Sequence, residues 1–489
     1  MKNSFSNLEP TSLWKEFYEL TQIPRPSGHT ERIRKYLLDF GNSNGLYSRT
    51  DEAGNVLIRK PASKGMEHQK AVVLQAHMDM VPQKNSNITH DFENDPLDVY
   101  IDGDWVKARN TTLGSDNGIG VAAILAILIS KEIKHGPIEA LFTNDEETGM
   151  YGAFGLQKGF LQGDILMNLD SEDEGELFVG CAGGIDADFT FQYSLIPVPK
   201  GDIAVKISLT GLLGGHSGVD IHLERANANK LMFRFLKIAI AEYEARLASV
   251  TGGSLRNAIP REAFAIITIP AEGLSDLQEL VDETVDMFND DYRGIETKIN
   301  LTLEEIPMID GVLPEAVQDD LVNAIYAAPN GVFRHIPQMP SVVETSSNLA
   351  IIKTEADKII VKCLLRSSAE SKKFELCSVH DSVFSLAGAK VEFLDGYPEW
   401  HPNFDSSVLR MMKSIYKQKW GKEPEIKVIH AGLECGIIGA LEPHLDMISF
   451  GPTIRNPHSP DEKVFIPSVN KFWNYLVSTL ECIPLKEKK

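Results

Sequence analysis

Short apolar runs alternate with longer apolar or amphipathic segments through the first 180 residues of the chain. The runs at 71–75, 138–143 and 165–169 consist largely of Val, Ile, Leu, Ala and Phe, which is typical of strands buried on both faces of a sheet. The apolar segment at 118–130 has the length of a helix. This alternation predicts an α/β domain with a mainly parallel, mixed sheet covered by helices, in which ligands gather at the carboxyl ends of the strands.

A different pattern occupies residues 182–399, where strand-like segments and amphipathic helices follow one another. The predicted strands are at 203–209, 263–269, 298–303, 358–365 and 390–394. The predicted helices are at 224–246, 274–288 and 315–327. We therefore expect an inserted α+β domain that comprises residues 183–399.

The α/β pattern returns in the last part of the chain. Helices are predicted at 404–419, 433–439 and 468–481, and strands at 425–430 and 447–450. We expect residues 400–489 to complete the sheet begun by residues 1–182, so that the two segments form one discontinuous domain.

Composition narrows the class of protein. A chain of 489 residues is too long for one ordinary core. Its net charge of −21 opposes binding to phosphate backbones and anionic lipids, so we expect neither nucleic acid nor membrane as a partner. The amino terminus lacks a continuous apolar segment, which predicts a cytoplasmic protein. The five cysteines lie far apart, and we expect them to be reduced and mostly buried.

Acidic and imidazole side chains recur where the predicted strands give way to loops. The set comprises His77, Asp116, Glu146, Glu147, Asp170 and His458. Two divalent cations about 3.5–4 Å apart need a bridging carboxylate, further nitrogen and oxygen ligands, and an open position for a water. The chain offers such ligands, so we predict a two-metal hydrolytic site.

Taken one at a time, these residues also have simpler interpretations. His77 would be satisfied within a core, Asp116 would cap a helix, and the neighbouring glutamates would lie in a solvated loop. The functional interpretation divides the two glutamates: Glu147 ligates a metal, while Glu146 takes a proton from a metal-held water and delivers it to the leaving amine. Asp79 follows His77 on the same side of the strand and would hold the second N–H of the ring.

Six blocks of sequence occur in a fixed order along the chain. They are Gln-Ala-His-Met-Asp-Met, Gly-Ser-Asp-Asn-Gly-Ile-Gly, Asp-Glu-Glu-Thr-Gly-Met-Tyr-Gly-Ala, Leu-Asp-Ser-Glu-Asp, Gly-Gly-His-Ser-Gly and Asn-Pro-His-Ser-Pro-Asp-Glu. In these blocks the chain resembles the co-catalytic di-zinc metallopeptidases that include carnosinases, aminoacylases and carboxypeptidase G, and the likeness covers essentially the whole length. The resemblance implies a phosphorylase/hydrolase-like catalytic domain with an inserted lid domain.

The resemblance also implies a role for each ligand. Asp116 would bridge two zinc ions, with cobalt and manganese as alternative metals. His77 and Asp170 would complete one coordination sphere, and Glu147 and His458 the other. In this clan an aspartate at the position of Asp170 is typical of dipeptidases and aminopeptidases, whereas a glutamate is typical of carboxypeptidases and aminoacylases. Two divalent cations against three carboxylates leave one net positive charge, which lowers the pKa of a bridging water.

Further residues of the resemblance lie outside the ligand set. His216 matches a lid-domain histidine that in related dimers reaches a neighbouring active site and stabilises the oxyanion. Such a contribution requires either a homodimer through the lid, which we expect, or a lid that closes. Asn257 and Arg366 resemble lid positions that hold the terminal carboxylate of the substrate. An ordinary loop histidine and a surface arginine are the alternative interpretations. Glu434 is a candidate partner for a free α-amino group.

We therefore expect a dipeptidase that hydrolyses unblocked dipeptides, including Xaa-His, through a bridging metal-bound hydroxide. Glu146 would be the general acid/base, and Asp79 would orient His77. An N-acyl-amino-acid deacylase and a tripeptide aminopeptidase are the alternatives on the same scaffold, and an inactive metal-binding protein is the alternative of another class. The acidic segment 85–104 is expected to be a solvated loop with a short hairpin.

Overall fold

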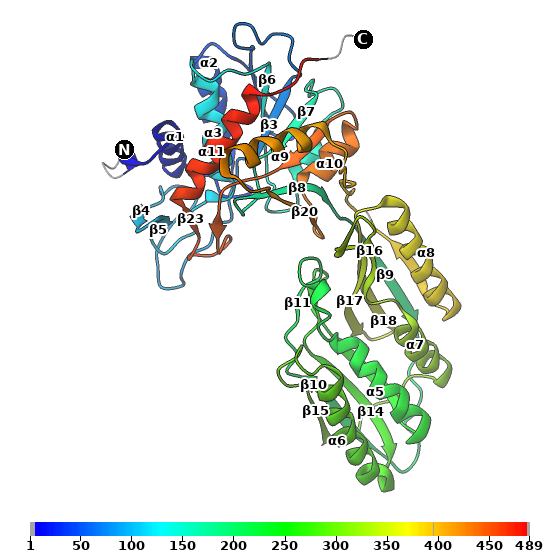
Figure 1. Cartoon of the computed structure of the whole chain (residues 1–489). Helices are drawn as coiled ribbons and strands as arrows, with labels where there is room; N and C mark the ends of the chain where they lie inside the picture. Colours follow the sequence, from blue (N-terminus) through cyan, green and yellow to red (C-terminus); the bar gives the residue numbers. More distant parts are fainter. Residues whose placement is uncertain (1–4, 395, 487–489) are drawn as a thin grey trace. The chain divides into compact units, whose positions relative to one another are not determined.

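The computed structural model describes residues 5–394 and 396–486, and the chain divides into two compact units (Figure 1). The first unit comprises Met1–Cys181, Pro402–Val428 and Leu433–Lys489. The second comprises Ala182–His401 and Ile429–Gly432. None of the helices in the described residues combines the length and the apolar character that crossing a bilayer requires.

The first unit is built on an eight-stranded mixed sheet with the strand order β1-β2-β6-β3-β7-β21-β8-β20. β3 (Val72–His77) pairs in parallel with both β6 (Ile138–Thr143) and β7 (Ile165–Asn168). β7 also pairs in parallel with β21 (Asp446–Ser449), so a strand from the last part of the chain completes the middle of the sheet. The remaining strands are β1 (Tyr47–Thr50), β2 (Val56–Lys60), β8 (Glu176–Cys181) and β20 (Glu425–Ile429).

Strands β3, β6 and β7 are buried along their whole length, as their apolar composition predicts. The apolar helix α3 (Ser115–Ile129) packs against β3 and against α1 (Thr11–Thr21). Because the three strands are parallel, the residues that follow them emerge at one edge of the sheet. The other helices of this unit are α2 (Glu31–Ser43), α4 (Tyr151–Gly155), α9 (Ser407–Trp420), α10 (Glu434–Leu441) and α11 (Ile466–Glu481), with a 3₁₀ turn at Phe5–Asn7.

A four-stranded antiparallel sheet, β22-β23-β5-β4, belongs to the same unit. The hairpin of β4 (Val99–Asp102) and β5 (Trp105–Ala108) overlaps the end of the acidic segment in which a short hairpin is predicted. β22 (Ile454–Arg455) pairs with β23 (Lys463–Phe465), so residues 456–462 form the loop of a second hairpin. This β22–β23 loop brings His458 into the unit.

The second unit is built on a nine-stranded antiparallel sheet in the order β15-β10-β14-β12-β17-β18-β9-β19, with β16 paired to β17. Its strands are β9 (Gly183–Gln192), β10 (Asp202–Thr210), β12 (Arg246–Gly252), β14 (Ala263–Pro270), β15 (Asn300–Ile306), β16 (Gly331–Ile336), β17 (Met339–Thr354), β18 (Lys358–Ser367) and β19 (Lys390–Phe393). Its helices are α5 (Ala228–Glu242), α6 (Leu274–Asp291), α7 (Glu315–Ala327) and α8 (Glu370–Leu386), with 3₁₀ turns at Ile221–Leu223 and Ala271–Gly273. One apolar core joins these helices to the sheet.

The structure differs from the predicted element bounds mainly in the second unit. The helix expected at 224–246 is too long, because the side chain of Asn227 accepts a hydrogen bond from the N–H of Lys230 and caps α5 there. At its other end Arg246 belongs to β12. The strand expected at 298–303 begins and ends later, as β15. No disulfide forms among the described residues, and four of the five cysteines are buried, as expected.

Candidate metal centre

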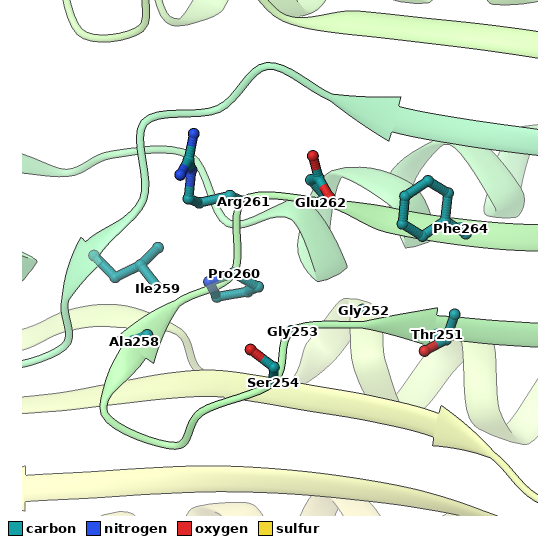
Figure 2. Close-up of a pocket in the computed structure, with 10 residues that line it drawn as sticks. All are labelled: Thr251, Gly252, Gly253, Ser254, Ala258, Ile259, Pro260, Arg261, Glu262 and Phe264. Atoms are coloured by element: carbon teal, nitrogen blue, oxygen red, sulfur yellow. The ribbon is translucent and has the colours of Figure 1, made fainter. Parts of the chain in front are cut away.

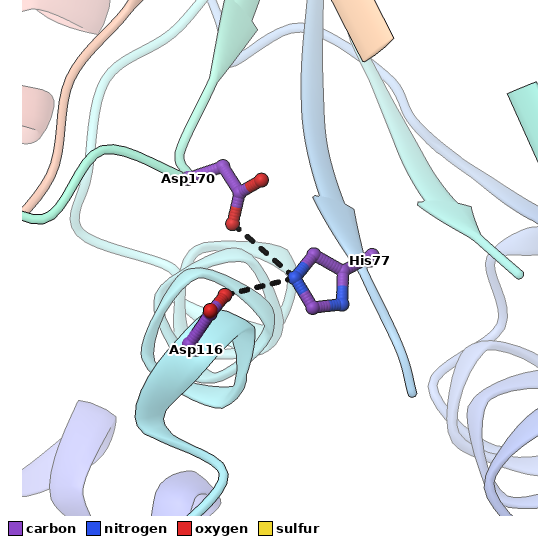
Figure 3. Close-up of side chains that lie close together, drawn as sticks. All are labelled: His77, Asp116 and Asp170. Atoms are coloured by element: carbon purple, nitrogen blue, oxygen red, sulfur yellow. Dashed lines mark hydrogen bonds and ion pairs between the residues drawn. The ribbon is translucent and has the colours of Figure 1, made fainter. Parts of the chain in front are cut away.

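The carboxyl end of β3 places one imidazole between two carboxylates. His77 is the last residue of β3 and is almost completely buried. Its Nε2 lies 2.9 Å from Oδ1 of Asp116 and 3.3 Å from Oδ1 of Asp170 (Figure 3). Asp170 reaches this position because β7, which ends two residues earlier, runs parallel to β3.

The second imidazole meets the other oxygen of the same aspartate. Nε2 of His458 lies 3.2 Å from Oδ2 of Asp116 and 2.9 Å from Oε2 of Glu147. Asp116 therefore directs one carboxylate oxygen to each imidazole, which is how a carboxylate bridges two cations. Its backbone is non-helical, at φ −82° and ψ 109°, although it lies in the first turn of α3.

Donor atoms in this cluster are close enough to share a cation. His77, Asp116 and Asp170 form one group whose ligand atoms lie within 4.8 Å of one another, and Asp116, Glu147 and His458 form another. His77 with Glu146 and Glu147 meets the same criterion, so the geometry leaves Glu146 open as a ligand. Imidazole nitrogen and carboxylate oxygen are ligands that zinc and other divalent transition metals accept.

The buried acids and imidazoles of the cluster shift one another's pKa values. Burial and the neighbouring Asp170 raise the pKa of the Glu146 carboxyl well above its usual range. Hydrogen bonds from His458 and His77 outweigh burial at Asp116 and hold the pKa of that carboxyl below its usual range. Hydrogen bonds to Asp116 and Glu147 raise the pKa of His458 to about 11. His458 and Asp116 thus each favour the charged form of the other.

Asp79 lies behind His77, on the side away from the cluster. Its Oδ1 is 3.4 Å from Nδ1 of His77. It also accepts hydrogen bonds from the hydroxyl of Ser27, at 2.7 Å, and from the N–H of Glu146, at 3.1 Å. One completely buried carboxylate therefore contacts the imidazole and also accepts a hydrogen bond from the loop of the acidic pair.

Glu434, the first residue of α10, lies against the same strand ends. Its Oε2 accepts hydrogen bonds from Nε2 of Gln75, at 2.6 Å, and from the hydroxyl of Thr143, at 2.8 Å. Its Oε1 is buried and has no hydrogen-bond partner among the described residues. Burial raises the pKa of this carboxyl to about 7, and nearby Asp170 adds to the effect.

His216, Asn257 and Arg366 belong to the second unit, whereas the metal-ligand candidates belong to the first. The N–H of Ser217 donates to the backbone oxygen of Asn257, at 2.8 Å, and β11 (Gly215–His216) pairs with β13 (Ala258–Ile259). Arg366 is almost completely buried and donates to the hydroxyls of Tyr397 and Ser217. The structure thus gathers these three candidates around Ser217, and Arg366 is not the surface arginine of the alternative interpretation.

The tautomer of His216 follows from its backbone contacts. Its Nδ1 accepts hydrogen bonds from the N–H groups of Gly218 and Val219, both at 3.1 Å, so the ring proton lies on Nε2. Burial and the charge of Arg366 lower its pKa. His216 is therefore a neutral ring near pH 7 that presents a donor at Nε2.

The second unit also contains a cavity of about 450 Å³, lined by residues 251–254, 258–262 and 264 (Figure 2). Asn257 lies in the turn between two of these stretches. Among the described residues that line the cavity there is no histidine or cysteine, and the only acidic side chain is that of Glu262. None of these lining residues belongs to the three groups of metal-ligand candidates.

Comparison with known proteins agrees with the geometry. The chain belongs to peptidase family M20/M25/M40, whose model matches residues 73–481. It is 45% identical over 484 residues to the cytosol non-specific dipeptidase of Escherichia coli (strain K12), with 99% of this chain and 100% of that protein covered.

Solved structures show the same relationship. The crystal structure of aminoacylhistidine dipeptidase from Vibrio alginolyticus matches with a TM-score of 0.94 and 49% identity over 99% of each chain. Aminopeptidase PepT from Bacillus cereus matches with a TM-score of 0.56 and 16% identity over 97% of this chain and 98% of that one, which shows a shared fold alone.

Proposed function

We propose that this chain is a metal-dependent dipeptidase that hydrolyses unblocked dipeptides, including Xaa-His. The observation that carries the proposal is the division of the Asp116 carboxylate between His77 and His458. The dipeptidases of E. coli and V. alginolyticus, which are similar along the whole chain, support the substrate class. The E. coli relative is described as cytosolic, and we propose a cytoplasmic location here as well.

The donor set fits two divalent cations, zinc in the first place and cobalt or manganese as alternatives. His77, Asp116 and Asp170 would hold one cation, and Asp116, Glu147 and His458 the other. Oε1 of Glu147 is buried without a hydrogen-bond partner in the described part of the chain, as expected for an atom whose partner is an ion. When bound, the two cations would polarise the scissile carbonyl and lower the pKa of a water between them.

Glu146 would transfer the proton that hydrolysis requires. Burial raises the pKa of Glu146, which brings its proton affinity closer to those of the metal-held water and the leaving amine. Asp79 would accept the Nδ1–H of His77 and so leave the lone pair of Nε2 directed at the cluster. The leaving amine would then receive its proton from Glu146.

Glu434 would select substrates with a free amino terminus. Its buried Oε1, which has no hydrogen-bond partner within residues 5–394 and 396–486, suits an ammonium group, and an N-acylated substrate would leave the carboxylate without that partner. This observation favours a dipeptidase over an N-acyl-amino-acid deacylase. Selection against tripeptides would come from the other end of the substrate, where Arg366 and Asn257 would hold the terminal carboxylate.

The roles of the domains follow from this assignment. Residues 1–182 and 400–489 would form the catalytic domain, and residues 183–399 a lid domain through which two copies of the chain dimerise. His216 would donate its Nε2–H to the oxyanion that forms on the carbonyl oxygen of the substrate. A neutral donor suits that task because it forms the hydrogen bond without first losing or gaining a proton.

Activity of metal-free and zinc-loaded protein on Ala-His, N-acetyl-His and Ala-Ala-Ala tests the proposed function. We expect Ala-His to be preferred over N-acetyl-His by roughly 30- to 5,000-fold in kcat/KM, since an unpaired buried charge costs about 2–5 kcal/mol. Chelation should abolish turnover and lower the Tm, because a ligand at 100 times its Kd stabilises the folded state by about 2.7 kcal/mol. Preference for N-acetyl-His would indicate a deacylase, and full turnover after exhaustive chelation would exclude metal dependence.

Exchange of subunits tests the proposed dimer. We expect His216→Ala and Glu146→Ala each to be nearly inactive as pure proteins. In a mixed dimer one site would combine the intact Glu146 of one chain with the intact His216 of the other, so activity should return. Activity of the mixture after unfolding and refolding together, compared with the two variants refolded separately, gives the measurement. Absence of recovery would show that His216 acts within its own chain or not at all.

A further inference from the structure

The carboxylate of Glu462 is buried at the end of the β22–β23 loop, with only 2% of the residue exposed. Its Oε2 accepts hydrogen bonds from the N–H groups of Leu113, at 2.7 Å, and Gly114, at 2.9 Å. Its Oε1 accepts from the N–H and the hydroxyl of Ser115, at 2.7 and 2.6 Å, and from the N–H of Asp116, at 3.3 Å. One carboxylate thus receives five hydrogen bonds from the four consecutive residues that end at the shared aspartate.

A buried cation holds the same loop from its other side. The guanidinium of Arg25 donates to the backbone oxygen of Gly114, at 2.5 Å, and to those of Met78 and Asp79, at 3.0 and 2.8 Å. A Cβ added at Gly114 would lie 2.7 Å from this guanidinium, so the contact requires glycine. Gly114 is therefore held at its C=O by the guanidinium of Arg25 and at its N–H by the carboxylate of Glu462.

These two charges connect the segments that carry the ligands. Glu462 lies four residues after His458 and binds the loop that ends at Asp116. Arg25 binds that loop and the segment that follows His77. Each charge therefore links the Asp116 loop to a different imidazole, and groups that orient ligands in this way tune the affinity of a metal site.

We propose that Glu462 is a positioning residue that sets the separation of Asp116 and His458, and hence the affinity for the cation held by Asp116, Glu147 and His458. Arg25 is its counterpart for the cation held by His77, Asp116 and Asp170. This inference rests on the proposed two-metal site. Glu462 itself contacts neither cation nor substrate and acts through the loop.

An ordinary capping role would have a different consequence. The N–H groups that Glu462 binds lie at the start of α3, where any acceptor stabilises a helix. A cap alone would lower the stability of the fold and would not distinguish one cation from the other. A loss of affinity for one cation but not for the other therefore distinguishes a positioning role of Glu462 from a capping role.

Glu462→Gln is the informative variant because it keeps the size of the side chain. One oxygen becomes an amide NH₂ that faces backbone N–H groups, so the hydrogen bonds at that position are lost. Calorimetric titration of the metal-free full chain with zinc measures both affinities. We expect the affinity for one cation to fall by roughly 10- to 100-fold and that for the other to stay near the wild-type value.

His458→Ala identifies which cation is affected. This variant should bind the cation of the His77 group and lose the other. In the His458→Ala background, Glu462→Gln should then change the affinity for the remaining cation very little, because both substitutions act on the other site. A further loss in the double variant as large as in the single one would overturn the assignment to the His458 site.

Glu139→Gln is the matched control. Glu139 is a buried carboxylate of the same unit that accepts from the N–H groups of Gln162, at 2.7 Å, and Gly163, at 2.9 Å. We expect Glu139→Gln to lower the Tm without lowering the affinity for either cation. Three results would each overturn the inference. The first two are an equal loss of affinity for both cations in Glu462→Gln and unchanged affinities in that variant. The third is the same selective loss of affinity for one cation in Glu139→Gln.

Two further outcomes are also decisive. If wild-type protein binds fewer than two zinc ions, the proposed two-metal site fails and the role of Glu462 fails with it. Two zinc ions in the wild type without selective loss in Glu462→Gln would overturn the role of Glu462 alone. If Glu462→Gln does not fold, Ser115→Ala replaces it, since this change removes one of the five hydrogen bonds and leaves the charge in place. Ser115→Ala should then weaken the same single cation to a smaller extent, and unchanged affinities in it would contradict the inference.

Discussion

Glu146→Ala should lower kcat for Ala-His by roughly 10²–10⁴-fold while the protein still binds two zinc ions, because a positioned general acid/base contributes about this factor. Asp116, Glu147, Asp170 and the two imidazoles would remain as ligands. The side chain of Glu146 lies beside the cluster, where burial already raises its pKa. Steady-state kinetics together with the zinc content of the purified variant give the measurement.

Asp145→Asn is the matched control for this experiment. Asp145 is the neighbouring carboxylate on the same loop, and its Oδ1 accepts a hydrogen bond from the N–H of Gly28 at 2.6 Å. It belongs to none of the three groups of ligand candidates, so kcat should stay within a few-fold of the wild type. Full activity of Glu146→Ala would refute the acid/base role, and loss of one zinc ion would make Glu146 a ligand instead.

Glu434→Gln should lower kcat/KM for Ala-His by roughly 30- to 5,000-fold, since removal of one partner of a buried charge pair costs about 2–5 kcal/mol. The substitution keeps the size of the side chain, and an amide oxygen can still accept from Gln75 or Thr143. For N-acetyl-His, which carries no ammonium group, the same change should leave kcat/KM equal or higher. The ratio of the two kcat/KM values is therefore the measurement.

Glu442→Gln provides the comparison at the other end of α10. Glu442 is also buried and accepts a hydrogen bond from the N–H of Gly159 at 2.6 Å. We expect a lower Tm but an unchanged ratio between the two substrates. If Glu434→Gln lowered kcat/KM for both substrates by the same factor, the carboxylate of Glu434 would support the cluster as a whole rather than bind the amino terminus of the substrate.

The meeting of His77, Glu147 and Asp170 in the first unit could be predicted, because buried parallel strands have a clear signature of continuous apolar residues. The runs that form β3, β6 and β7 end at a histidine or shortly before acidic residues, and parallel pairing places these ends together. The signal for His458 is weaker. It follows the strand predicted at 447–450, but it reaches the cluster through a short hairpin between two-residue and three-residue strands that the sequence pattern does not predict.

Glu462 and Arg25 could not be found from the pattern of the sequence. Apart from the hydroxyl of Ser115, their partners are backbone N–H and C=O groups, which almost every residue possesses, so no pattern of side chains marks them. Glu462 lies inside a block that carries the family resemblance, yet its role depends on where the loop before α3 passes. The roles proposed for Glu146, Asp79, His216, Asn257 and Arg366 remain predictions.

The limits of helix α5 show a local reason for error. An amphipathic pattern continues beyond both ends of the helix, but the Asn227 side chain accepts a hydrogen bond from the N–H of Lys230, and Arg246 belongs to the strand β12. Tertiary pairing of this kind overrides the preference of a segment taken alone. By contrast, α7 has its predicted bounds, with a proline before its first residue.

The position of β21 has a consequence for biosynthesis. This strand separates β7 from β8 in the sheet, yet its residues, Asp446–Ser449, are translated long after both neighbours. Until it emerges from the ribosome, one edge of β7 presents unpaired backbone groups to other nascent chains. Folding of the first unit is therefore completed only near the end of translation, and protection by chaperones during that interval would limit aggregation.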